Sequence, residues 1–272
     1  MSQQKTWLIT GVSRGFGRLW AEAALERGDC VVATARNAAD LQDLVSAYGE
    51  RVLPLSLDVT DRAAAFAAVR QGHQHFGRLD VVVNNAGYSY SGAIEELEPA
   101  EAHANFETNV FGFLNVVQAA LPLLRSQRGG HILTLSSIGG LVAFPTGGTY
   151  TATKFALEAL SEALAGEVAD FGVKVTIVEP GSFATSFGSS TQSAPQMPEY
   201  NALRQNIRAG FKPEMIGNPA ATAQAVLDVV DASQPPLRLI LGSWPLDMIK
   251  QAYRSRIETW EQWSTVSVAA QG

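Results

Sequence analysis

Short apolar runs alternate with longer amphipathic stretches along most of the chain. The short runs are rich in Val, Ile and Leu, and several are apolar throughout, as parallel strands buried on both faces are. They predict strands at 6–10, 31–35, 52–57, 81–84, 131–135, 173–178 and 237–241. Helical spacing predicts helices at 15–27, 38–48, 61–76, 101–125, 150–170 and 219–231. This alternation is typical of an α/β fold, with an open, doubly wound parallel sheet of about seven strands and helices on both faces.

One segment interrupts the alternation directly after the sixth predicted strand. Residues 181–213 are rich in Ser, Thr, Gly, Gln and Pro, yet they also carry Phe183, Phe187 and Phe211. Because ligands of such folds bind at the carboxyl edge of the sheet, we expect this segment to form a lid over a substrate. A disordered insertion is the alternative. No linker divides the chain before it, so we expect one domain over residues 1–272.

A further amphipathic helix is predicted at 245–264, beyond the last strand. Its charged residues Lys250, Arg254, Glu258 and Glu261 fall away from an apolar stripe. Such a stripe packs against its own core, a partner subunit or the mouth of a substrate pocket, and we favour packing beside the lid. The stripe consists of Leu246, Ile249, Tyr253, Ile257 and Trp260.

Composition and charge argue against several classes of partner. The net charge is −6 and there is no run of Lys or Arg, so we expect no nucleic-acid partner. The chain shows no secretory leader and no apolar stretch long enough to span a bilayer, which predicts a cytoplasmic protein without membrane contact. The single cysteine, Cys30, lies in an apolar run and is interpreted as an inert thiol rather than a nucleophile. His73 and His75 stand two apart on a predicted helix and point in different directions, so no metal site is expected.

A glycine-rich segment, residues 10–17, joins the first predicted strand to the first helix. Its glycines allow the backbone to turn tightly and to approach a pyrophosphate, which would lie at the N-terminus of the helix. The residues expected to contact a dinucleotide here are Gly11, Ser13, Arg14, Gly15, Phe16 and Gly17.

The same segment also fits the Gly-x-Ser-x-Gly nucleophile elbow of serine hydrolases, with Ser13 as the nucleophile. That site needs an earlier strand and loop for its oxyanion hole, and only one strand precedes Ser13. The last histidine of the chain, His131, falls in a predicted strand, and no later one could serve as the base. A hydrolase is therefore the weaker interpretation.

A second motif, Tyr150-x-x-x-Lys154, opens the predicted helix 150–170. The spacing places both side chains on one helical face. A phenol is a poor acid–base catalyst at neutral pH, but a neighbouring ammonium favours the phenolate and brings its pKa towards the working range.

These features together resemble the signature of the short-chain dehydrogenase/reductase family, in its compact single-domain branch. The resemblance covers about residues 5–242 and extends to the hydroxysteroid and retinol dehydrogenase subgroup. It implies a single Rossmann-like domain and a homo-oligomer, either a dimer or a tetramer. The matching positions are the segment 10–17, Asn84-Asn85-Ala86-Gly87, Asn109, Ser137, Tyr150-x-x-x-Lys154 and Pro180-Gly181.

The resemblance implies a role for each matching residue. Tyr150 would transfer the proton, and Ser137 would hydrogen-bond the reacting oxygen. Lys154 would also bind the nicotinamide ribose, and Asn109 would hold a water that links Lys154 to solvent. Further cofactor contacts are implied for Asp58, Val59, Asn85, Ala86, Gly87, Pro180, Gly181, Phe183 and Thr185.

The end of the second predicted strand indicates which dinucleotide binds. NAD sites of this type place an acidic residue there to accept the ribose 2′-hydroxyl, whereas a nearby Arg accommodates a 2′-phosphate. The chain has Ala35 followed by Arg36, with Ser13 and Arg14 available in the glycine-rich segment. This pattern predicts NADP(H) as the cofactor. The alternative is that Arg36 merely begins a solvated loop.

The sequence therefore predicts an NADPH-dependent oxidoreductase that interconverts a ketone or aldehyde and its alcohol, with Tyr150 as general acid and base. The aromatic residues of the lid suggest a medium-sized apolar substrate. A non-catalytic NADPH-binding sensor or scaffold on the same fold is the alternative, and a serine hydrolase using Ser13 is a more remote one.

Overall fold

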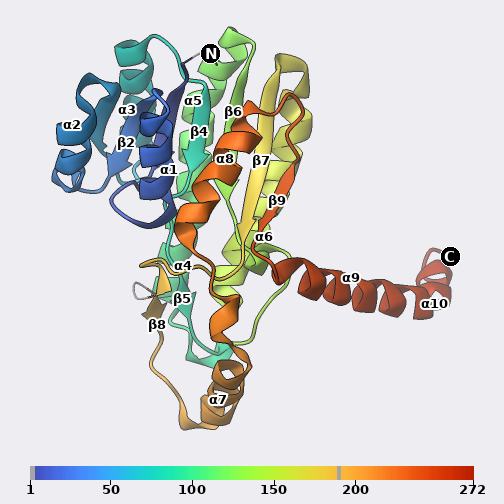
Figure 1. Ribbon diagram of the computed structural model, residues 1–272. Helices are drawn as coiled ribbons and strands as arrows, with labels where there is room; N and C mark the ends of the chain where they lie inside the picture. Colours follow the sequence, from blue (N-terminus) through green and yellow to red (C-terminus); the bar gives the residue numbers. More distant parts are fainter. Residues whose placement is uncertain (1–3, 189–190) are drawn as a thin grey trace.

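A seven-stranded parallel sheet forms the centre of the computed structural model, which describes residues 4–188 and 191–272 (Figure 1). The strand order is β3-β2-β1-β4-β6-β7-β9, so the direction of winding reverses between β1 and β4. The strands are β1 (Thr6–Thr10), β2 (Cys30–Ala35), β3 (Val52–Ser56), β4 (Val81–Asn84), β6 (Gly130–Leu135), β7 (Val173–Pro180) and β9 (Arg238–Leu241). The predicted doubly wound sheet is confirmed, and each predicted strand agrees with the observed one to within two residues.

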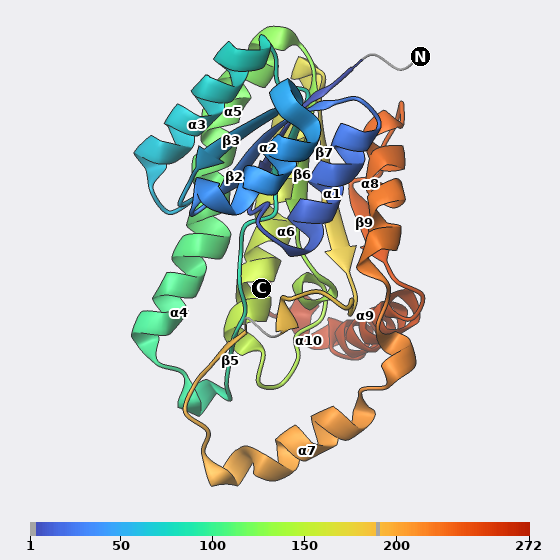
Figure 2. The same ribbon diagram turned by 60° about the vertical axis from the view of Figure 1, so that its left-hand side comes forward.

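Helices cover both faces of this sheet (Figure 2). Trp7 and Ile9 of β1 join the core beneath α1, α2 and α8, whereas Leu8 joins the core beneath α3, α5 and α6. Side chains that alternate along the strand are therefore buried on both sides, which explains the continuous apolar runs. The helices are α1 (Gly15–Glu26), α2 (Gln42–Tyr48), α3 (Arg62–Phe76), α4 (Pro99–Phe106), α5 (Gly112–Gln127), α6 (Gly148–Val168) and α8 (Thr222–Asp231).

The predicted helix 101–125 is two α-helices joined by a π-helical turn at Glu107–Phe111. The turn lies between α4 and α5 and carries Asn109, which is 2% exposed. Single π-helical turns of this kind are frequent at functional sites. In the described part of the chain, no helix combines the length and the apolar character that crossing a bilayer requires.

The segment 181–213 carries secondary structure of its own. It contains the short strand β8 (Gln192–Ser193) and the helix α7 (Asn201–Gly210). Residues 189–190 of this segment lie outside the described residues, as do residues 1–3 of the predicted domain. Strand β8 pairs in parallel with β5 (Tyr90–Ser91), which follows β4.

Helix α7 is attached to the body by an ion pair. Arg204 contacts the buried carboxylate of Glu96, and the backbone N–H of Met197 donates to the same carboxylate at 2.7 Å. The hydrogen bond from Arg204 lowers the pKa of Glu96 to about 2. The predicted lid is therefore fastened at two points, by β8 and by this ion pair.

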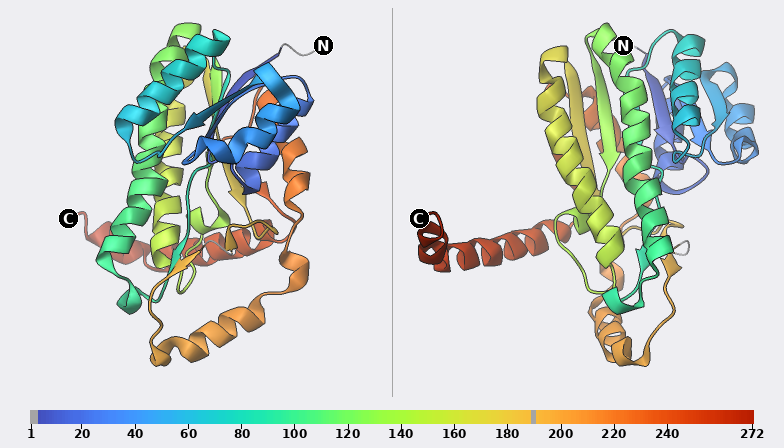
Figure 3. Two further views of the ribbon diagram at one scale, coloured as in Figure 1. Left: turned by 90° about the vertical axis from the view of Figure 1, so that its left-hand side faces the viewer. Right: turned by 180° about the vertical axis from the view of Figure 1, so that it is seen from behind.

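The last helices project away from the body (Figure 3). Helix α9 (Pro245–Gln262) is followed by α10 (Ser264–Ala269). Near its base, Ile249 is buried with Ile138 and Leu141, and the preceding Trp244 Nε1 donates to the Met215 carbonyl at 2.9 Å. The predicted helix 245–264 is present, but the favoured expectation that its stripe packs beside the lid is wrong, because the buried stripe residue Ile249 packs on Ile138 and Leu141. The helix leaves the body after its first turns, so the later stripe residues are exposed.

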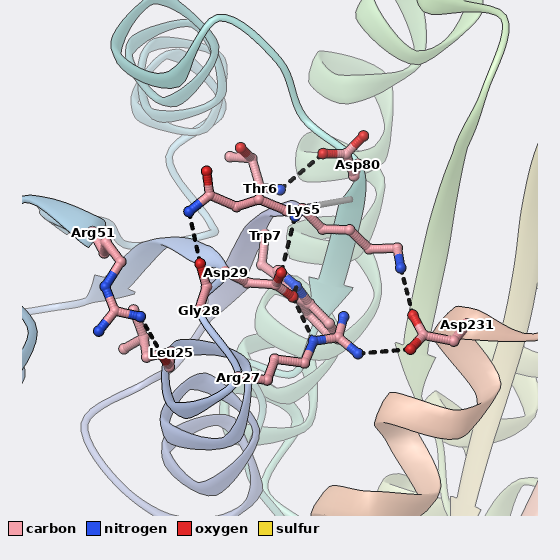
Figure 4. A network of polar contacts seen from close by, with 11 residues as sticks. Lys5, Thr6, Trp7, Leu25, Arg27, Gly28, Asp29, Arg51, Asp80 and Asp231 are labelled. Atoms are coloured by element: carbon pink, nitrogen blue, oxygen red, sulfur yellow. Dashed lines mark hydrogen bonds and ion pairs between the residues drawn. The ribbon is translucent and has the colours of Figure 1, made fainter. Parts of the chain in front are cut away.

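A polar network closes the amino-terminal edge of the sheet (Figure 4). Asp29 accepts hydrogen bonds from Trp7 Nε1 at 2.8 Å and from Arg27 Nε at 2.7 Å. Asp231, at the end of α8, forms ion pairs with Lys5 and Arg27. These contacts tie the first strand to the last helix of the layered body. They lie at the edge opposite the carboxyl ends of the strands.

Candidate active site

The residues singled out from the sequence gather at the carboxyl ends of four neighbouring strands, β1, β4, β6 and β7. The glycine-rich segment follows β1, residues 85–87 follow β4, Ser137 follows β6, and Gly181 follows β7. Because the sheet reverses its winding between β1 and β4, this is the place where such folds bind ligands.

The glycine-rich segment has the backbone geometry that a pyrophosphate site needs. Gly11 and Gly15 have φ of 72° and 65°, in the left-handed region that favours glycine. A Cβ at Gly17 would lie 2.6 Å from the Gly11 carbonyl oxygen and would also meet Asn85. The side chain of Arg14 does not cap α1, so the N–H groups at the helix N-terminus face outward. These features fit a dinucleotide phosphate at this helix end.

Asn85 braces this segment. Its Nδ2 donates to the carbonyl oxygens of Thr10 at 2.7 Å and Gly11 at 2.9 Å. In return, the Thr10 hydroxyl accepts from the backbone N–H groups of Asn85 and Ala86, each at 3.0 Å. The side chain of Asn85 therefore holds the loop in shape, while the backbone of residues 85–87 remains at the carboxyl edge of β4.

Tyr150 and Lys154 lie on the same face of the first turns of α6. The Lys154 Nζ is 5.6 Å from the centre of the Tyr150 ring and donates to the Leu135 carbonyl at 2.7 Å. The Ser137 Oγ accepts from the Gly139 N–H at 3.1 Å, and a Cβ at Gly139 would lie 3.5 Å from that oxygen and 3.6 Å from Cε1 of Tyr150. The structure thus brings together the three residues expected to act on the substrate.

Burial governs the protonation of this pair. It raises the pKa of Tyr150 to about 12, against the opposing effect of the Ser137 hydrogen bond. It also lowers the pKa of Lys154 to about 8, and the negative charge of Glu158 opposes that shift. The direction for Tyr150 is opposite to the one expected from a nearby ammonium alone, because desolvation penalises the phenolate more strongly. At neutral pH the phenol therefore holds its proton.

Asn109 is held by the loop that follows β4. Its Oδ1 accepts from the Tyr88 N–H at 3.0 Å, and its Nδ2 donates to the Tyr88 carbonyl at 2.9 Å. The Nδ2 also donates to the Thr153 hydroxyl at 3.0 Å, next to Lys154. Asn109 therefore connects the end of β4 to the helix that carries Tyr150 and Lys154.

The residues after β7 reach the glycine-rich segment through aromatic contacts. The ring of Phe183 meets that of Phe16 edge-on, with 5.4 Å between centroids. The Gly181 N–H donates to the Leu241 carbonyl at 2.9 Å. The ring of Phe187 lies 5.6 Å from that of Tyr150, and its N–H donates to the Thr185 hydroxyl at 3.3 Å. This stretch thus lies between the two predicted motifs, with Pro180 buried before it, and its cofactor contacts remain a prediction.

Asp58 and Val59 occupy different surroundings. The Asp58 carboxylate is exposed and accepts from the Thr60 N–H at 3.0 Å and the Thr60 hydroxyl at 2.8 Å. Val59 is buried against Gly112. Asp58 is therefore accessible to a ligand, whereas the side chain of Val59 belongs to the core.

The strand end that was predicted to select the cofactor presents exposed cations. Ala35, the last residue of β2, is 4% exposed, and Arg36 follows it on the surface. Within the described residues, neither Arg36 nor Arg14 has a hydrogen bond or ion pair from its guanidinium. An unpaired cation at the end of β2 and another in the glycine-rich segment suit an anionic group of a ligand.

A buried acidic cluster beneath Lys154 was not found from the sequence. Glu158 lies one turn after Lys154, and Glu179 immediately precedes the Pro180-Gly181 pair. The Nε of Arg238 is 3.0 Å from the Glu158 carboxylate and 3.5 Å from that of Glu179. Burial, together with the charge of Glu158, raises the pKa of Glu179 to about 8. The available signal was an acid that follows the apolar pair Ile177-Val178 directly before Pro180-Gly181.

His131 lies at the opposite edge of the sheet from Ser13. It pairs in register with Val81, which pairs with Trp7 near the start of β1, whereas Ser13 follows the end of that strand. The His131 Nε2 is 2.9 Å from the Thr176 hydroxyl inside the core. A Ser13–His131 pair is therefore impossible in this fold. Within residues 4–188 and 191–272, no three His, Cys, Asp or Glu side chains are grouped to hold a metal ion.

Burial of His131 should make the protein sensitive to acid. Desolvation lowers the pKa of His131 from 6.5 to about 4, so the stability that its neutral form supports is lost as the pH falls between these values. The loss should approach about 3 kcal/mol near pH 4. A His131→Gln variant, which cannot gain a proton, should show a flatter dependence of unfolding free energy on pH in urea titrations. The exposed His103→Gln is the control and should keep the wild-type slope, and an equal slope in both variants would refute the prediction.

With this geometry in place, comparison with known proteins decides the family. The family model described as short chain dehydrogenase matches residues 5–196. The chain belongs to the short-chain dehydrogenase/reductase family. Among curated relatives, the short-chain dehydrogenase resembles "Oxidoreductase BOA17" of Botryotinia fuckeliana, with 40% identity over 98% of this chain and 99% of that protein.

Solved structures of short-chain dehydrogenases agree. A short-chain dehydrogenase from Streptomyces avermitilis is 40% identical, with a TM-score of 0.90 over 99% of each chain. An alcohol dehydrogenase from Thermococcus sibiricus, solved with 5-hydroxy-NADP, is 28% identical, with a TM-score of 0.75 over 89% of this chain and 98% of that one. The short-chain dehydrogenase described here is therefore an oxidoreductase of a family whose members bind nicotinamide dinucleotides.

Proposed function

We propose that this protein is an NADPH-dependent oxidoreductase that interconverts a ketone or aldehyde and its alcohol. The convergence of Tyr150, Ser137 and Lys154 beside a glycine-rich helix N-terminus carries this proposal. A non-catalytic NADPH-binding sensor would need the glycine-rich segment but not the full catalytic set.

Tyr150, Ser137 and Lys154 have separate roles in the proposed reaction. When bound, the nicotinamide supplies or accepts a hydride. The Tyr150 hydroxyl gives its proton to the substrate oxygen in the reductive direction, and Ser137 hydrogen-bonds that oxygen. Lys154 carries positive charge beside the ring, which stabilises the phenolate left behind. The raised pKa of Tyr150 keeps the proton on the phenol at neutral pH, so the hydroxyl is in the protonated form that a proton donor needs.

The choice of NADPH rests on the end of β2. Ala35 offers no carboxylate for a ribose 2′-hydroxyl, and the free guanidinium of Arg36 suits a 2′-phosphate. The Thermococcus relative was solved with a derivative of NADP, whereas a reductase from Brucella melitensis was solved with NADH. The family thus uses both dinucleotides, and Ala35 and Arg36 at the end of β2 favour NADPH.

An apolar carbonyl compound of medium size is the proposed substrate. The aromatic rings of Phe183 and Phe187 reach the glycine-rich segment and Tyr150, so a substrate beside the proton donor would meet apolar surface. The related fungal protein is named only as an oxidoreductase, so the comparisons do not single out the hydroxysteroid and retinol dehydrogenase subgroup.

The proposal is tested by assaying purified protein against a panel of ketones and aldehydes while following NADPH oxidation at 340 nm. Turnover of apolar carbonyl compounds is expected. Tight NADPH binding without turnover of any member of a broad panel would favour the sensor instead.

A further inference from the structure

The C-terminal arm, residues 245–272, presents apolar surface that this chain does not cover. Arg256 donates to the Leu141 carbonyl at 3.2 Å, and every residue beyond it is exposed. Ile257 is 46% exposed, Trp260 66% and Trp263 61%. Figure 1 and the right-hand view of Figure 3 show α9 extending away from the layered body. Large apolar side chains gathered in this way mark a surface that another molecule covers.

The charges of α9 are arranged in opposite halves of the helix. Lys250 and Arg254 lie towards its base, whereas Glu258 and Glu261 lie towards its tip. At 3.6 residues per turn, all four fall on the same flank of the apolar stripe. The flank is therefore positive near the body and negative near the tip.

We propose that the arm pairs with the arm of a second copy of this chain, in antiparallel orientation about a two-fold axis close to Arg256. In antiparallel helix pairs the same flank of each helix faces the other, because a two-fold axis makes the interface self-complementary. Lys250 then faces the partner subunit's Glu261, and Arg254 faces the partner subunit's Glu258. The apolar stripes meet beside this row of ion pairs.

Antiparallel pairing also provides neighbours for the apolar side chains at both ends of α9. Leu246, near the base, is 45% exposed, and Val266 and Val268, beyond the tip, are 58% and 72% exposed. In the antiparallel pair the tip of one arm lies over the base of the other. The base adjoins Ile138 and Leu141, the residues that follow Ser137. The partner would thus stabilise the turn that carries the catalytic serine.

The charge of the arm favours a second copy over a lipid surface. The arm carries three basic residues, Lys250, Arg254 and Arg256, which are balanced by three acidic ones, Asp247, Glu258 and Glu261. Helices that lie on membranes usually have an excess of Lys and Arg on the polar face. This inference does not depend on the proposed reaction.

The first test is the mass of the full-length protein in solution, measured by light scattering across a range of concentrations. Ile257→Glu combined with Trp260→Glu should halve the mass of the assembly. Gln251→Glu combined with Gln262→Glu, on the opposite face of the same helix, is the matched control and should leave the mass unchanged. All these residues are exposed, so thermal unfolding should confirm that each variant folds. An unchanged mass in the stripe variant overturns the proposal.

The second test distinguishes antiparallel pairing from any other contact of the arm. One variant combines Lys250→Glu and Arg254→Glu, and another combines Glu258→Lys and Glu261→Lys. Each alone places like charges opposite each other and should fall to half the wild-type mass. An equimolar mixture restores every ion pair and should regain the wild-type mass. Failure of the mixture to assemble overturns the antiparallel register.

A lipid partner is a separate outcome. Wild-type protein that stays monomeric and floats with vesicles of phosphatidylcholine and phosphatidylglycerol would overturn the proposal in favour of a membrane surface. The expected result is a dimer, or a larger assembly built from such dimers, that does not float.

Discussion

A Tyr150→Phe variant is expected to lose turnover by roughly 10²- to 10⁴-fold, the usual contribution of a positioned general acid. The change removes the hydroxyl that is expected to transfer the proton but keeps the ring, whose centroid lies 5.6 Å from that of Phe187. NADPH affinity should remain close to that of the wild type, because the hydroxyl serves proton transfer. Turnover is measured at 340 nm, and the dissociation constant of NADPH by quenching of tryptophan fluorescence.

Two further variants make this result specific. Tyr48→Phe, far from the site at the end of α2, should keep full activity. Lys154→Ala should reduce both turnover and NADPH affinity, since this residue is expected to contact the nicotinamide ribose as well as Tyr150. Substantial turnover by Tyr150→Phe would remove Tyr150 from the reaction, and a large loss of NADPH affinity would show that the hydroxyl also supports the cofactor.

The second large effect concerns the cofactor. A charge-assisted hydrogen bond contributes about 1.5–3 kcal/mol, so Arg36 should favour NADPH over NADH by roughly 10- to 150-fold. Combining Ala35→Asp with Arg36→Leu should reverse the preference, because a carboxylate accepts the ribose 2′-hydroxyl and repels a 2′-phosphate. The ratio of the two dissociation constants measures this without any substrate.

The matched control is Arg70→Leu, which removes an exposed cation from α3. It should leave the ratio unchanged, which separates a local contact from a general effect of net charge. Equal affinity of the wild-type protein for NADH and NADPH would refute the role given to the end of β2.

Much of the fold could be predicted because both faces of the sheet are buried. Strand β4, for example, is three valines followed by Asn84, and its predicted and observed limits are the same. The glycine-rich segment and the Tyr150–Lys154 pair could also be predicted from the sequence, because each depends on close spacing within one turn or one helix.

Features that depend on contacts between distant parts of the chain could not be predicted from the sequence. Strands β5 and β8 have two residues each, too few to show a period, and only their mutual pairing defines them. The buried cluster of Glu158, Glu179 and Arg238 joins three elements far apart in the chain. The stripe on α9 was visible in the sequence, but the direction in which the helix leaves the body depends on the packing of Ile249 and Trp244 at its base.

Under the proposed function, the attachment of the segment 181–213 would let substrate specificity change independently of the chemistry. The segment 181–213 is fastened through β8 to β5 and through Arg204 to Glu96, whereas Ser137, Tyr150 and Lys154 depend on β6 and α6. Apolar side chains between the two fastenings can therefore be exchanged without moving the proton donor. Such a division lets one scaffold acquire new substrates by few substitutions, and Phe187, which packs beside Tyr150, is the position where an exchange would affect both properties at once.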